Sequence, residues 1–335
     1  MSELKDAGVQ IRLAYQAMIN AGIDVAQLFS KLGIDESYLD KANLRTPHEA
    51  QPLFWSLLEE QTEDPDIGLH LGQHLPIFKG QVIEYLFLSS PTFGEGLRRS
   101  LNYQRLISDA AASNLVIEQD SSFIQMVAAS GGAKKIRHFN ECFAQGVIGF
   151  FKSITDDVFT PEYIEFEHDE PKNAEEVRRV LGCDVKFGGE DNRIYFNSSL
   201  LERRSPHAEP ELLALHEQFA SEQLARIEKE DVVIKVNKII AELLDSGEVT
   251  LELVAERLEI KPRSLRTKLS DIETNFNQIL ADFRYKLARR LLAKTNETID
   301  EIVYLTGFSE PSTFYRAFKR WSEMTPIEYR KSKQL

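Results

Sequence analysis

The feature that most constrains the fold is a near-repeat in the last third of the chain. The stretch TLELVAERLEIKPRSLRTKL begins at Thr250, and TIDEIVYLTGFSEPSTFYRAF begins at Thr298, 48 residues later. The second copy is one residue longer in its middle, so that Pro262 corresponds to Pro311. Each copy is predicted to form a short helix, a tight turn and a second helix, which is the plan of a helix-turn-helix.

The second copy carries clear signals for where its helices begin and end. Thr298, with Glu301 three residues later, predicts a capping box at the start of the first helix. Gly307 can take the left-handed conformation that the turn requires. Ser309 is the expected N-cap of the following helix, with Pro311 in its first turn.

That following helix is predicted to have one buried and one exposed face. Phe314, Phe318 and Trp321 recur with Ala317 at helical spacing and are expected to face a core. The residues left on the exposed face are Ser312, Tyr315, Arg316, Lys319 and Arg320. A helix fits the DNA major groove, where arginine meets base acceptors and lysine meets phosphates. These five residues are therefore predicted to contact DNA.

The first copy predicts the same arrangement. Leu265, Leu269 and Ile272 are expected to turn inward. The outward-facing candidates for DNA contact are Arg263, Ser264, Arg266 and Thr267. A basic patch on a helix is usually only a solvated face, but two such units in register favour DNA binding over that interpretation.

A single long helix is predicted between the two copies. The stretch NFNQILADFRYKLARRLLAK has one apolar stripe: Phe276, Ile279, Leu280, Phe283, Leu287 and Leu291. About 18 helical residues span roughly 27 Å. Such a strut suits two recognition helices held about 34 Å apart, which is one turn of DNA.

The charge of the chain is divided unevenly. The formal net charge is −13, yet residues 230–335 carry 18 Lys and Arg against 17 Asp and Glu, a net charge of +1, which leaves −14 for residues 1–229. The acidity therefore belongs to the N-terminal part and does not exclude a nucleic-acid surface at the other end. A chain of 335 residues is long enough for two domains. The charged stretch ARIEKED, residues 225–231, places the expected boundary between domains 1–228 and 229–335.

The N-terminal domain is predicted to be α+β. Residues 1 to about 75 have helical patterns, including AYQAMINAG with its terminal glycine and HEAQPLFWSLLEEQT. The stretch NLVIEQDSSFIQMVAAS predicts two strands joined by a polar turn, and YIEFEH, VKF and RIYF predict three more. NAEEVRRVLG is expected to be a short helix closed by Gly182, and residues 209–224 are helical again. This mixture argues against a doubly wound parallel sheet.

Other candidate sites are weaker. No glycine-rich phosphate loop, GxSxG or HExxH motif is present, so neither catalysis nor a cofactor is expected. His70 and His74 have the spacing of metal ligands but no third ligand nearby. His138 and Cys142 have the same spacing with Glu141 beside them, which leaves a metal or redox role as an alternative, but no metal is expected. Glu141 lies in an apolar helix and needs a partner, more simply a structural hydrogen bond than an effector.

The sequence also carries a prediction about location. It contains no apolar run of about 18 residues, no secretion signal and only two cysteines, Cys142 and Cys183, so a cytoplasmic protein without a membrane segment is expected. The aromatic side chains that could line an apolar pocket, or equally a core, are Phe78, Tyr85, Phe87, Tyr103 and Phe123.

The C-terminal stretch IDEIVYLTGFSEPSTFYRAFKRWSEMTPIEYRK resembles the DNA-binding domain of the AraC/XylS family of bacterial transcription regulators. Thr325 with Glu328 fits the cap of that family's closing helix. The first unit departs from the family pattern, because Glu259 stands where a turn glycine is usual and Lys261 where a serine or threonine cap is usual. Each departure is expected to cost about 1 kcal/mol.

The N-terminal part resembles the ligand domain of one branch of this family, which includes regulators of ornithine use and of quorum-sensing virulence. The pieces that carry this resemblance are DPDIGLHLGQ, EYLFLSSPTFGEGLRRSLNY and YIEFEHDEPKNAEEVRRVLGCDVKFGGEDNRIYFNSSLL. The resemblance implies a regulator, expected to be an activator, that binds double-stranded operator DNA, RNA polymerase and a small effector, and that can form a homodimer. The alternative is an N-terminal module for protein interaction or oligomerisation without an effector.

Overall fold

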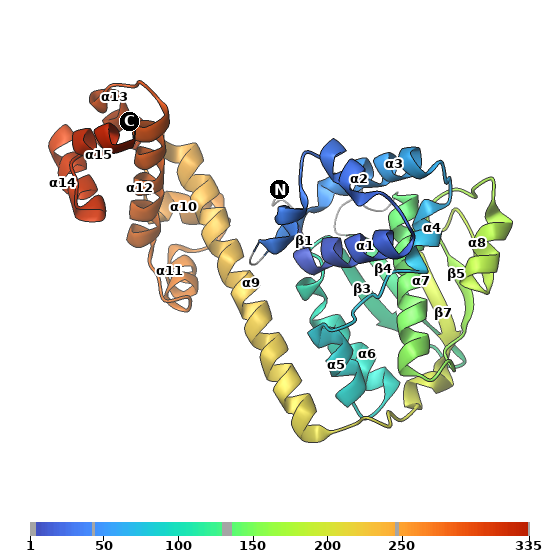
Figure 1. The fold of residues 1–335 in the computed structure, drawn as a ribbon. Coiled ribbons are helices and arrows are strands. Elements are labelled where there is room, and N and C mark those ends of the chain that lie inside the picture. Colours follow the sequence, from blue (N-terminus) through green and yellow to red (C-terminus); the bar gives the residue numbers. More distant parts are fainter. Residues whose placement is uncertain (1–4, 42–43, 129–135, 245–247, 334–335) are drawn as a thin grey trace. The chain divides into compact units, whose positions relative to one another are not determined.

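The computed structural model describes residues 5–41, 44–128, 136–244 and 248–333, which form two compact units. The units are Met1–Leu224 and Ala225–Leu335, and the division falls inside helix α9, Pro210–Leu244 (Figure 1). The expected boundary at 228/229 lies a few residues further along this helix. The charged stretch of residues 225–231 is thus helical rather than an irregular linker.

The described residues of the N-terminal unit form α-helices, short 3-10 helices and two sheets. Its α-helices are α1 Gly8–Asn20, α2 Val25–Lys31, α3 Gln51–Thr62, α4 Ile67–Gly72, α5 Val82–Ser89, α6 Phe93–Asn102, α7 Arg137–Ile154 and α8 Ala174–Leu181. Short 3-10 helices are η1 Glu36–Asp40, η2 His48–Ala50, η3 Gln104–Leu106 and η5 Ser198–Glu202. The strands are β1 Lys5–Ala7, β2 Arg45–Pro47, β3 Ala111–Val116, β4 Ser121–Ala128, β5 Pro161–Glu165, β6 Asp184–Lys186 and β7 Asn192–Asn197.

The larger sheet has the strand order β3-β4-β7-β5-β6. Its pairs are antiparallel except for β5 with β6, which are parallel and joined through α8. Helix α8 ends as expected at Gly182, whose φ of 73° is left-handed. The predicted α+β class is confirmed. Although GGEDN joins β6 to β7 in sequence, β7 pairs with β4 and β5 instead.

The first 75 residues are not wholly helical, which corrects the expectation. Strands β1 and β2 pair antiparallel, with Asp6 opposite Thr46. Each strand has three residues, which is too short for an alternating pattern to be visible in the sequence. Their pairing places Asp6 beside residues from much later in the chain.

The two faces of the larger sheet differ. Ile124 on β4 lies directly opposite Ile194 on β7. Both side chains are buried on the face of the sheet that packs against helices, among them α7. Phe123, one residue before Ile124, therefore points to the other face, where its ring lies 4.7 Å from that of Tyr195. Figure 1 shows α7 running along the sheet.

The C-terminal unit is all-helical. It contains the end of α9 and α10 Leu251–Arg257, α11 Pro262–Ser270, α12 Phe276–Lys294, α13 Ile299–Leu305, α14 Pro311–Ser322 and α15 Pro326–Lys333. Helices α10 and α11 form the first predicted helix-turn-helix, and α13 and α14 form the second. The long helix between them is α12, with 19 residues, as predicted.

Helix α12 packs into two hydrophobic cores rather than one. Its first half, with Phe276 and Ile279, packs with α9, α10 and α11. Its second half places Ala288 and Leu292 against α13, α14 and α15. The single stripe expected from the sequence is therefore wrong for the second half, where the fully buried residues are Ala288 and Leu292 and Leu291 is only half-buried.

Candidate functional site

The second helix-turn-helix forms through local capping. Glu301 N–H donates to Thr298 Oγ1 at 3.2 Å, and Thr298 N–H donates to Glu301 Oε2 at 2.7 Å, which confirms the predicted capping box. Gly307 has a φ of 71° in the turn, as expected. The N-cap of α14 is Glu310, not Ser309, so the helix begins one residue later than predicted, at Pro311.

Helix α14 presents the predicted face to solvent. Phe314, Ala317 and Phe318 are buried, with Phe314 and Phe318 at 0% exposure. The exposed residues include Ser312, Arg316, Lys319 and Arg320, whereas Tyr315 is half-buried against the core. Among the described residues, the guanidinium of Arg316 makes contacts of 3.4 Å to Ser312 O and Thr313 Oγ1, which are long for hydrogen bonds, so it is available for a stronger partner.

Helix α11 of the first unit has the same geometry. Leu265 and Leu269 are buried, and the predicted contact residues are all exposed: Arg263, Ser264, Arg266 and Thr267. Arg266 Nη2 lies 2.7 Å from Glu252 Oε1 of α10, in an ion pair that is more than half exposed. An exposed pair of this kind contributes about 0–1 kcal/mol, so Arg266 can exchange Glu252 for a phosphate or base.

The turn of the first unit shows the two departures from the family pattern. Glu259 has a φ of 56°, the left-handed conformation that favours glycine. Lys261 is the N-cap of α11, and a lysine side chain has no acceptor for the N–H groups of the first turn. The fold of the unit is nevertheless formed, with Ile260 N–H donating to Ala255 O at 3.0 Å.

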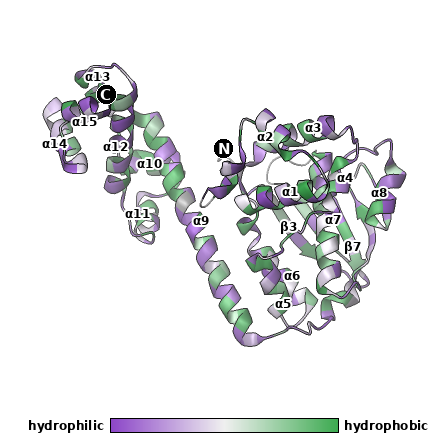
Figure 2. Ribbon diagram, in the orientation of Figure 1, coloured by the Kyte–Doolittle hydropathy of each residue, from purple (hydrophilic) through white to green (hydrophobic). Residues whose placement is uncertain are grey.

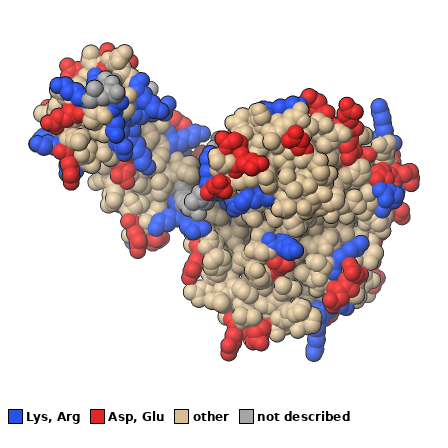
Figure 3. Space-filling view, in the orientation of Figure 1, with Lys and Arg blue, Asp and Glu red and all other residues tan. Residues whose placement is uncertain are grey.

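Two exposed residues of the recognition helices were missed from the sequence. Thr313 of α14 corresponds to Ser264 of α11 when the copies are aligned on their prolines, and it is exposed. Lys268 of α11 is also exposed. Aligning the two copies would have identified Thr313, because it occupies the position of Ser264. On the face shown in Figure 3, lysine and arginine side chains gather over the C-terminal unit around α12 and α15.

A cavity of about 350 Å³ lies within the N-terminal unit. Helices α1, α3, α6 and α7 and the inner face of the larger sheet line it. The sheet contributes Ile124, Met126 and Ile194, which share one face because Ile124 pairs with Ile194 and Met126 is two residues along β4. Helix α7 contributes Phe139, Cys142, Phe143, Val147 and Phe151. A volume of this size is in the range of small-molecule sites.

Of the five aromatic residues proposed from the sequence, Phe78 and Phe87 line the cavity. Phe123 is on the outer face of the sheet. Tyr85 is exposed and its ring lies 5.4 Å from that of His216, while Tyr103 shares a hydrogen bond of 2.8 Å with Ser221 Oγ. The lining aromatic residues that the sequence did not single out are Tyr38, Phe54, Trp55, Phe139, Phe143 and Phe151.

One end of the cavity is polar and centres on Asp6. Its carboxylate accepts hydrogen bonds from Ser108 Oγ at 2.6 Å and Gln51 Nε2 at 3.0 Å, and lies 3.0 Å from His48 Nδ1. Burial opposes ionisation of Asp6, but the bonds from His48, Ser108 and Gln51 hold its pKa below the ordinary value. The carboxylate is thus ionised and its oxygens are already engaged.

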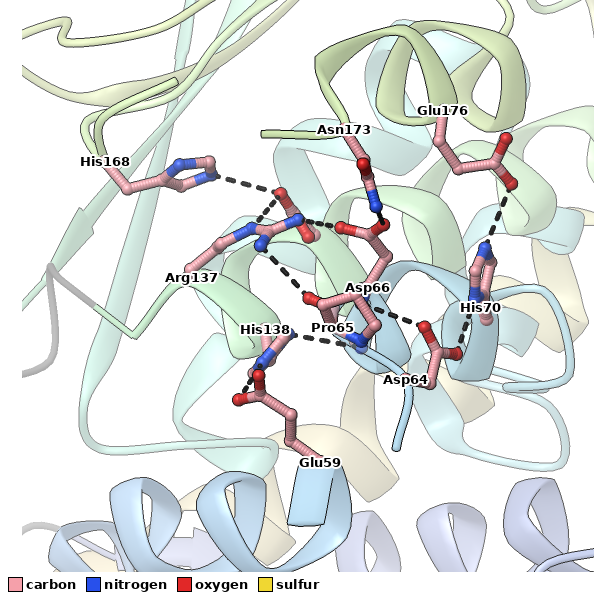
Figure 4. A network of polar contacts seen from close by, with 12 residues as sticks. Glu59, Asp64, Pro65, Asp66, His70, Arg137, His138, His168, Asn173 and Glu176 are labelled. Carbon is pink, nitrogen blue, oxygen red and sulfur yellow. Dashed lines mark hydrogen bonds and ion pairs between the residues drawn. The ribbon is translucent and has the colours of Figure 1, made fainter. Parts of the chain in front are cut away.

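A polar network holds α7 in place (Figure 4). Arg137 donates from Nε to Glu141 Oε1 at 2.9 Å, and its Nη2 donates to Asp66 at the start of α4. Asp66 also accepts from Asn173 Nδ2 at 2.9 Å, next to α8. His168 Nε2 lies 3.5 Å from Glu141 Oε1. The network therefore fixes the helix that forms one wall of the cavity.

Glu141 Oε1 has the structural partner that the sequence required, whereas Glu141 Oε2 is buried without a partner among the described residues. It is 0% exposed, and burial raises its pKa to about 7 although Arg137 favours the ionised form. Burial also raises the pKa of the neighbouring Cys142 thiol to about 12, so the thiol stays protonated. Both groups lie on α7, with Cys142 on the side of the cavity.

The candidate metal pairs have other roles. His70 lies 2.6 Å from Asp64 and 3.0 Å from Glu176, and His138 Nε2 lies 3.1 Å from Glu59. His74 is exposed. Within the described ranges, no group of three or more His, Cys, Asp or Glu side chains has the arrangement of a metal site.

Comparison with known families gives two matches along the chain. Residues 22–205 match the arabinose-binding domain of AraC transcription regulators, and residues 254–332 match a helix-turn-helix domain. The chain belongs to the AraC/XylS family of transcription regulators. The predicted resemblance is thereby confirmed, and this AraC/XylS-family protein is a DNA-binding transcription regulator with an arabinose-binding-like N-terminal domain.

Relatives of this regulator come from several bacteria. The ornithine utilization regulator of Pseudomonas aeruginosa is 28% identical over 276 residues, which is 80% of this chain and 79% of the relative. The regulator VirS of Mycobacterium tuberculosis is 28% identical over 167 residues, 49% of this chain and 48% of the relative. The crystal structure of the regulator CdpR from Pseudomonas aeruginosa is 18% identical, with a TM-score of 0.47 and coverage of 96% and 97%.

A transmembrane helix needs about 20 predominantly apolar residues. Across the described part of the chain, no helix of this regulator combines that length with that apolar character.

Proposed function

We propose that this regulator reads a specific DNA site with α11 and α14, and that a small molecule bound in the cavity of the N-terminal unit controls it. The cavity of about 350 Å³ is the observation that carries the proposal. Well-packed interiors leave few voids larger than a water molecule, so a space of this size inside a folded unit is typical of a ligand site.

The proposed DNA contacts are the exposed residues of the two recognition helices. Arg316 and Arg263 are the candidates for base readout, because arginine can donate two hydrogen bonds to guanine. Lys319 and Arg320 are candidates for phosphate contacts, which contribute affinity rather than sequence preference. The remaining candidates are Ser264, Arg266, Thr267, Ser312 and Tyr315.

We further propose that this regulator is a cytoplasmic activator that contacts RNA polymerase. An HTH-type transcriptional activator, CfaD of Escherichia coli, is 33% identical over 95 residues, 28% of this chain and 36% of the relative. Tyr304 of α13 is 70% exposed and Leu305 beside it is 37% exposed. This apolar pair lies on the helix before α14 and offers a contact for a protein partner.

A homodimer is proposed through the N-terminal half of α9. Leu213 and Ala220 pack into the core of the unit, whereas Leu212, Leu215 and Phe219 are 48%, 59% and 51% exposed. These three residues lie on one side of the helix, because positions three and seven apart share a face. Figure 2 shows hydrophobic residues recurring along this helix. A second copy of α9 would cover them.

The test is an in vitro selection of genomic DNA fragments on the full chain, beside a variant with Arg316→Ala and Lys319→Ala. The proposal expects an enriched motif with two half-elements about one helical turn apart, lost in the double variant. A motif that survives the double substitution would exclude α14 as the reading helix. A thermal-shift screen of small molecules then separates effector control from an N-terminal module without an effector, since a ligand of the native unit raises its melting temperature.

A further inference from the structure

The cavity of the N-terminal unit has features that specify the chemistry of its ligand. We infer that it binds an uncharged, largely hydrophobic molecule that carries a single hydrogen-bond acceptor, such as a ketone or an ester. This inference rests on the proposed control by a small molecule and adds its chemical class. Four observations carry it: the apolar walls, the engaged polar groups, two unpaired buried polar atoms, and the charge of the lining.

The walls are predominantly hydrocarbon. Side chains of Phe54, Phe139, Phe143 and Phe151 come from α3 and α7, and Ile124 and Ile194 come from the sheet. A sugar has a hydroxyl on nearly every carbon, and each one buried without a partner costs about 1–3 kcal/mol. Walls of this kind therefore favour a ligand with a hydrocarbon body.

Several polar groups that line the cavity are already paired with one another. Asp6 accepts from Ser108 and Gln51, as described above, and Gln51 Oε1 accepts from Trp55 Nε1 at 3.0 Å. Gln104 accepts from the N–H of Ser113 and donates to its carbonyl oxygen at 3.4 Å. These groups keep little hydrogen-bonding capacity for a ligand.

Two buried atoms of the lining have no partner among the described residues. Ser100 of α6 is 7% exposed, and its Oγ has no hydrogen-bond partner among the described residues. The Nε2 of Gln10 on α1 is likewise buried without a partner in the described part of the chain. Buried polar groups are rarely left unsatisfied, so both atoms are available to a bound molecule. Both groups can donate a hydrogen bond to an acceptor of the ligand.

The charge of the lining excludes ionic ligands. Among the described residues that line the cavity there is no lysine, arginine or histidine, and Asp6 supplies a negative charge. A carboxylate buried here would have no cation to pair with and would face Asp6. An ammonium group would need an oxygen of Asp6, and those oxygens are occupied. An amino acid such as ornithine, which carries both kinds of charge, therefore does not fit the lining.

The test compares three ligands with a common nine-carbon chain: nonan-2-one, nonanoate and nonylammonium. Trp55 lines the cavity, and the chain has two tryptophans, so a Trp321→Phe background makes its fluorescence specific for this site. Nonan-2-one is expected to change the Trp55 emission saturably and to raise the melting temperature. Nonanoate and nonylammonium are expected to bind at least tenfold more weakly. Equal or tighter binding of either ion would overturn the inference while leaving small-molecule control intact.

Substitutions in the cavity test where the polar head group and the hydrocarbon tail of nonan-2-one bind. Ser100→Ala should weaken nonan-2-one about threefold to tenfold, as expected for one lost hydrogen bond. Ser153→Ala is the matched control, because Ser153 Oγ donates to Phe150 O outside the cavity lining, and its affinity should match wild type. Ala14→Phe fills the cavity from α1 and should abolish binding, with circular dichroism to verify that the variant is folded. Wild-type affinity in both Ser100→Ala and Ala14→Phe would refute the assigned site.

A neutral dye separates failure of this inference from failure of the proposed function. N-phenyl-1-naphthylamine brightens in apolar surroundings and carries no charge. Binding of the dye without binding of nonan-2-one would show that the cavity takes ligands but that the acceptor class is wrong. If neither the dye nor any of the three nine-carbon compounds binds the full chain, both the ligand class and the control by a cavity ligand are wrong.

Discussion

Arg284 Nη2 donates a hydrogen bond of 2.7 Å to the carbonyl oxygen of Gly307. This bond joins the long helix α12 to the turn of the second helix-turn-helix. The guanidinium also lies 4.7 Å from the ring centroid of Phe308, and Leu244 of α9 lies against the same glycine. Because Gly307 is left-handed, with a φ of 71°, its carbonyl points where Arg284 can reach it. The bond therefore helps to fix the position of α14 relative to α12.

Arg284→Leu is expected to lower the free energy of unfolding of the C-terminal unit by about 1–2 kcal/mol, because it removes a charged hydrogen bond and a cation–π contact. Trp321 reports on this region, since its ring lies 5.6 Å from Tyr285 and 6.2 Å from Phe308. Urea denaturation in a Trp55→Phe background gives the measurement. Arg290→Leu, an exposed arginine on α12, is the control, and an equal loss in both variants would contradict a specific role for Arg284.

Glu259→Gly is expected to stabilise the first helix-turn-helix by up to about 1 kcal/mol. Glu259 has a φ of 56°, and glycine adopts this conformation without the steric cost that a side chain meets. Glu256→Gly, within α10, is the matched control and should destabilise by about 0.5–1 kcal/mol. Far-UV circular dichroism during urea denaturation measures both. Loss of stability in both variants would show that the turn is not strained.

The C-terminal unit could be predicted well because its signals are local. The cap of Thr298 with Glu301 lies within one helical turn, and the turn at Gly307 depends on a single residue. The start of α14 was misplaced because Ser309 and Glu310 both precede Pro311, and a serine is the more usual cap. The packing of α12 against two cores was missed. The hydrophobic periodicity of a helix does not show which other helices will cover each of its faces.

The cavity could not be predicted in the same way because long-range contacts build it. Asp6 meets His48 across 42 positions in the sequence and Ser108 across 102. Phe123 was proposed as a lining residue, but the lining residue is Ile124, since neighbours along a strand face opposite sides. The face of β4 that is covered depends on its pairing with β7 and on the position of α7. Composition alone does not distinguish the two faces.

Arg316→Ala is expected to weaken binding to the preferred DNA site by about 1–3 kcal/mol without unfolding the chain. The residue is exposed on α14, and its contacts within the protein are long, so little stability is lost. Fluorescence anisotropy with specific and random duplexes measures the effect, which should be confined to the specific one. Arg98→Ala, an exposed arginine of the N-terminal unit, is the control for net charge. Unchanged specific affinity would remove Arg316 from the interface.

The stability of the N-terminal unit is expected to depend on pH through Glu141. Burial raises the pKa of this carboxyl from 4.5 to about 7. Below pH 4.5 the folded and unfolded chains are both protonated. As the pH rises towards 7 the unfolded chain ionises first, so the free energy of unfolding falls, by at most about 3 kcal/mol, and then levels off.

Glu141→Gln should remove this slope, because glutamine has no proton to lose and its amide oxygen can still accept from Arg137. The variant should therefore gain stability relative to wild type as the pH rises from about 4.5 to 7. Urea denaturation across this range measures the difference. His168 and His70 are unchanged in both proteins, so their titration largely cancels. Glu175→Gln, at a side chain that is 91% exposed, is the control. Parallel curves for wild type and Glu141→Gln would exclude Glu141 as the source.

Leu215→Glu is expected to convert a dimer into a monomer. Leu215 is 59% exposed in the centre of the face that Leu212 and Phe219 complete on α9. In an interface between two copies, this substitution would bury a carboxylate against apolar side chains without a partner, which costs several kcal/mol. Leu53→Glu on α3 is the matched control, because Leu53 is 55% exposed and lies outside that face. Analytical ultracentrifugation at several concentrations measures the masses. If wild type and both variants all sediment as dimers, another surface forms the interface. If all sediment as monomers, α9 does not mediate dimerisation, and the two recognition helices must reach DNA from a single chain.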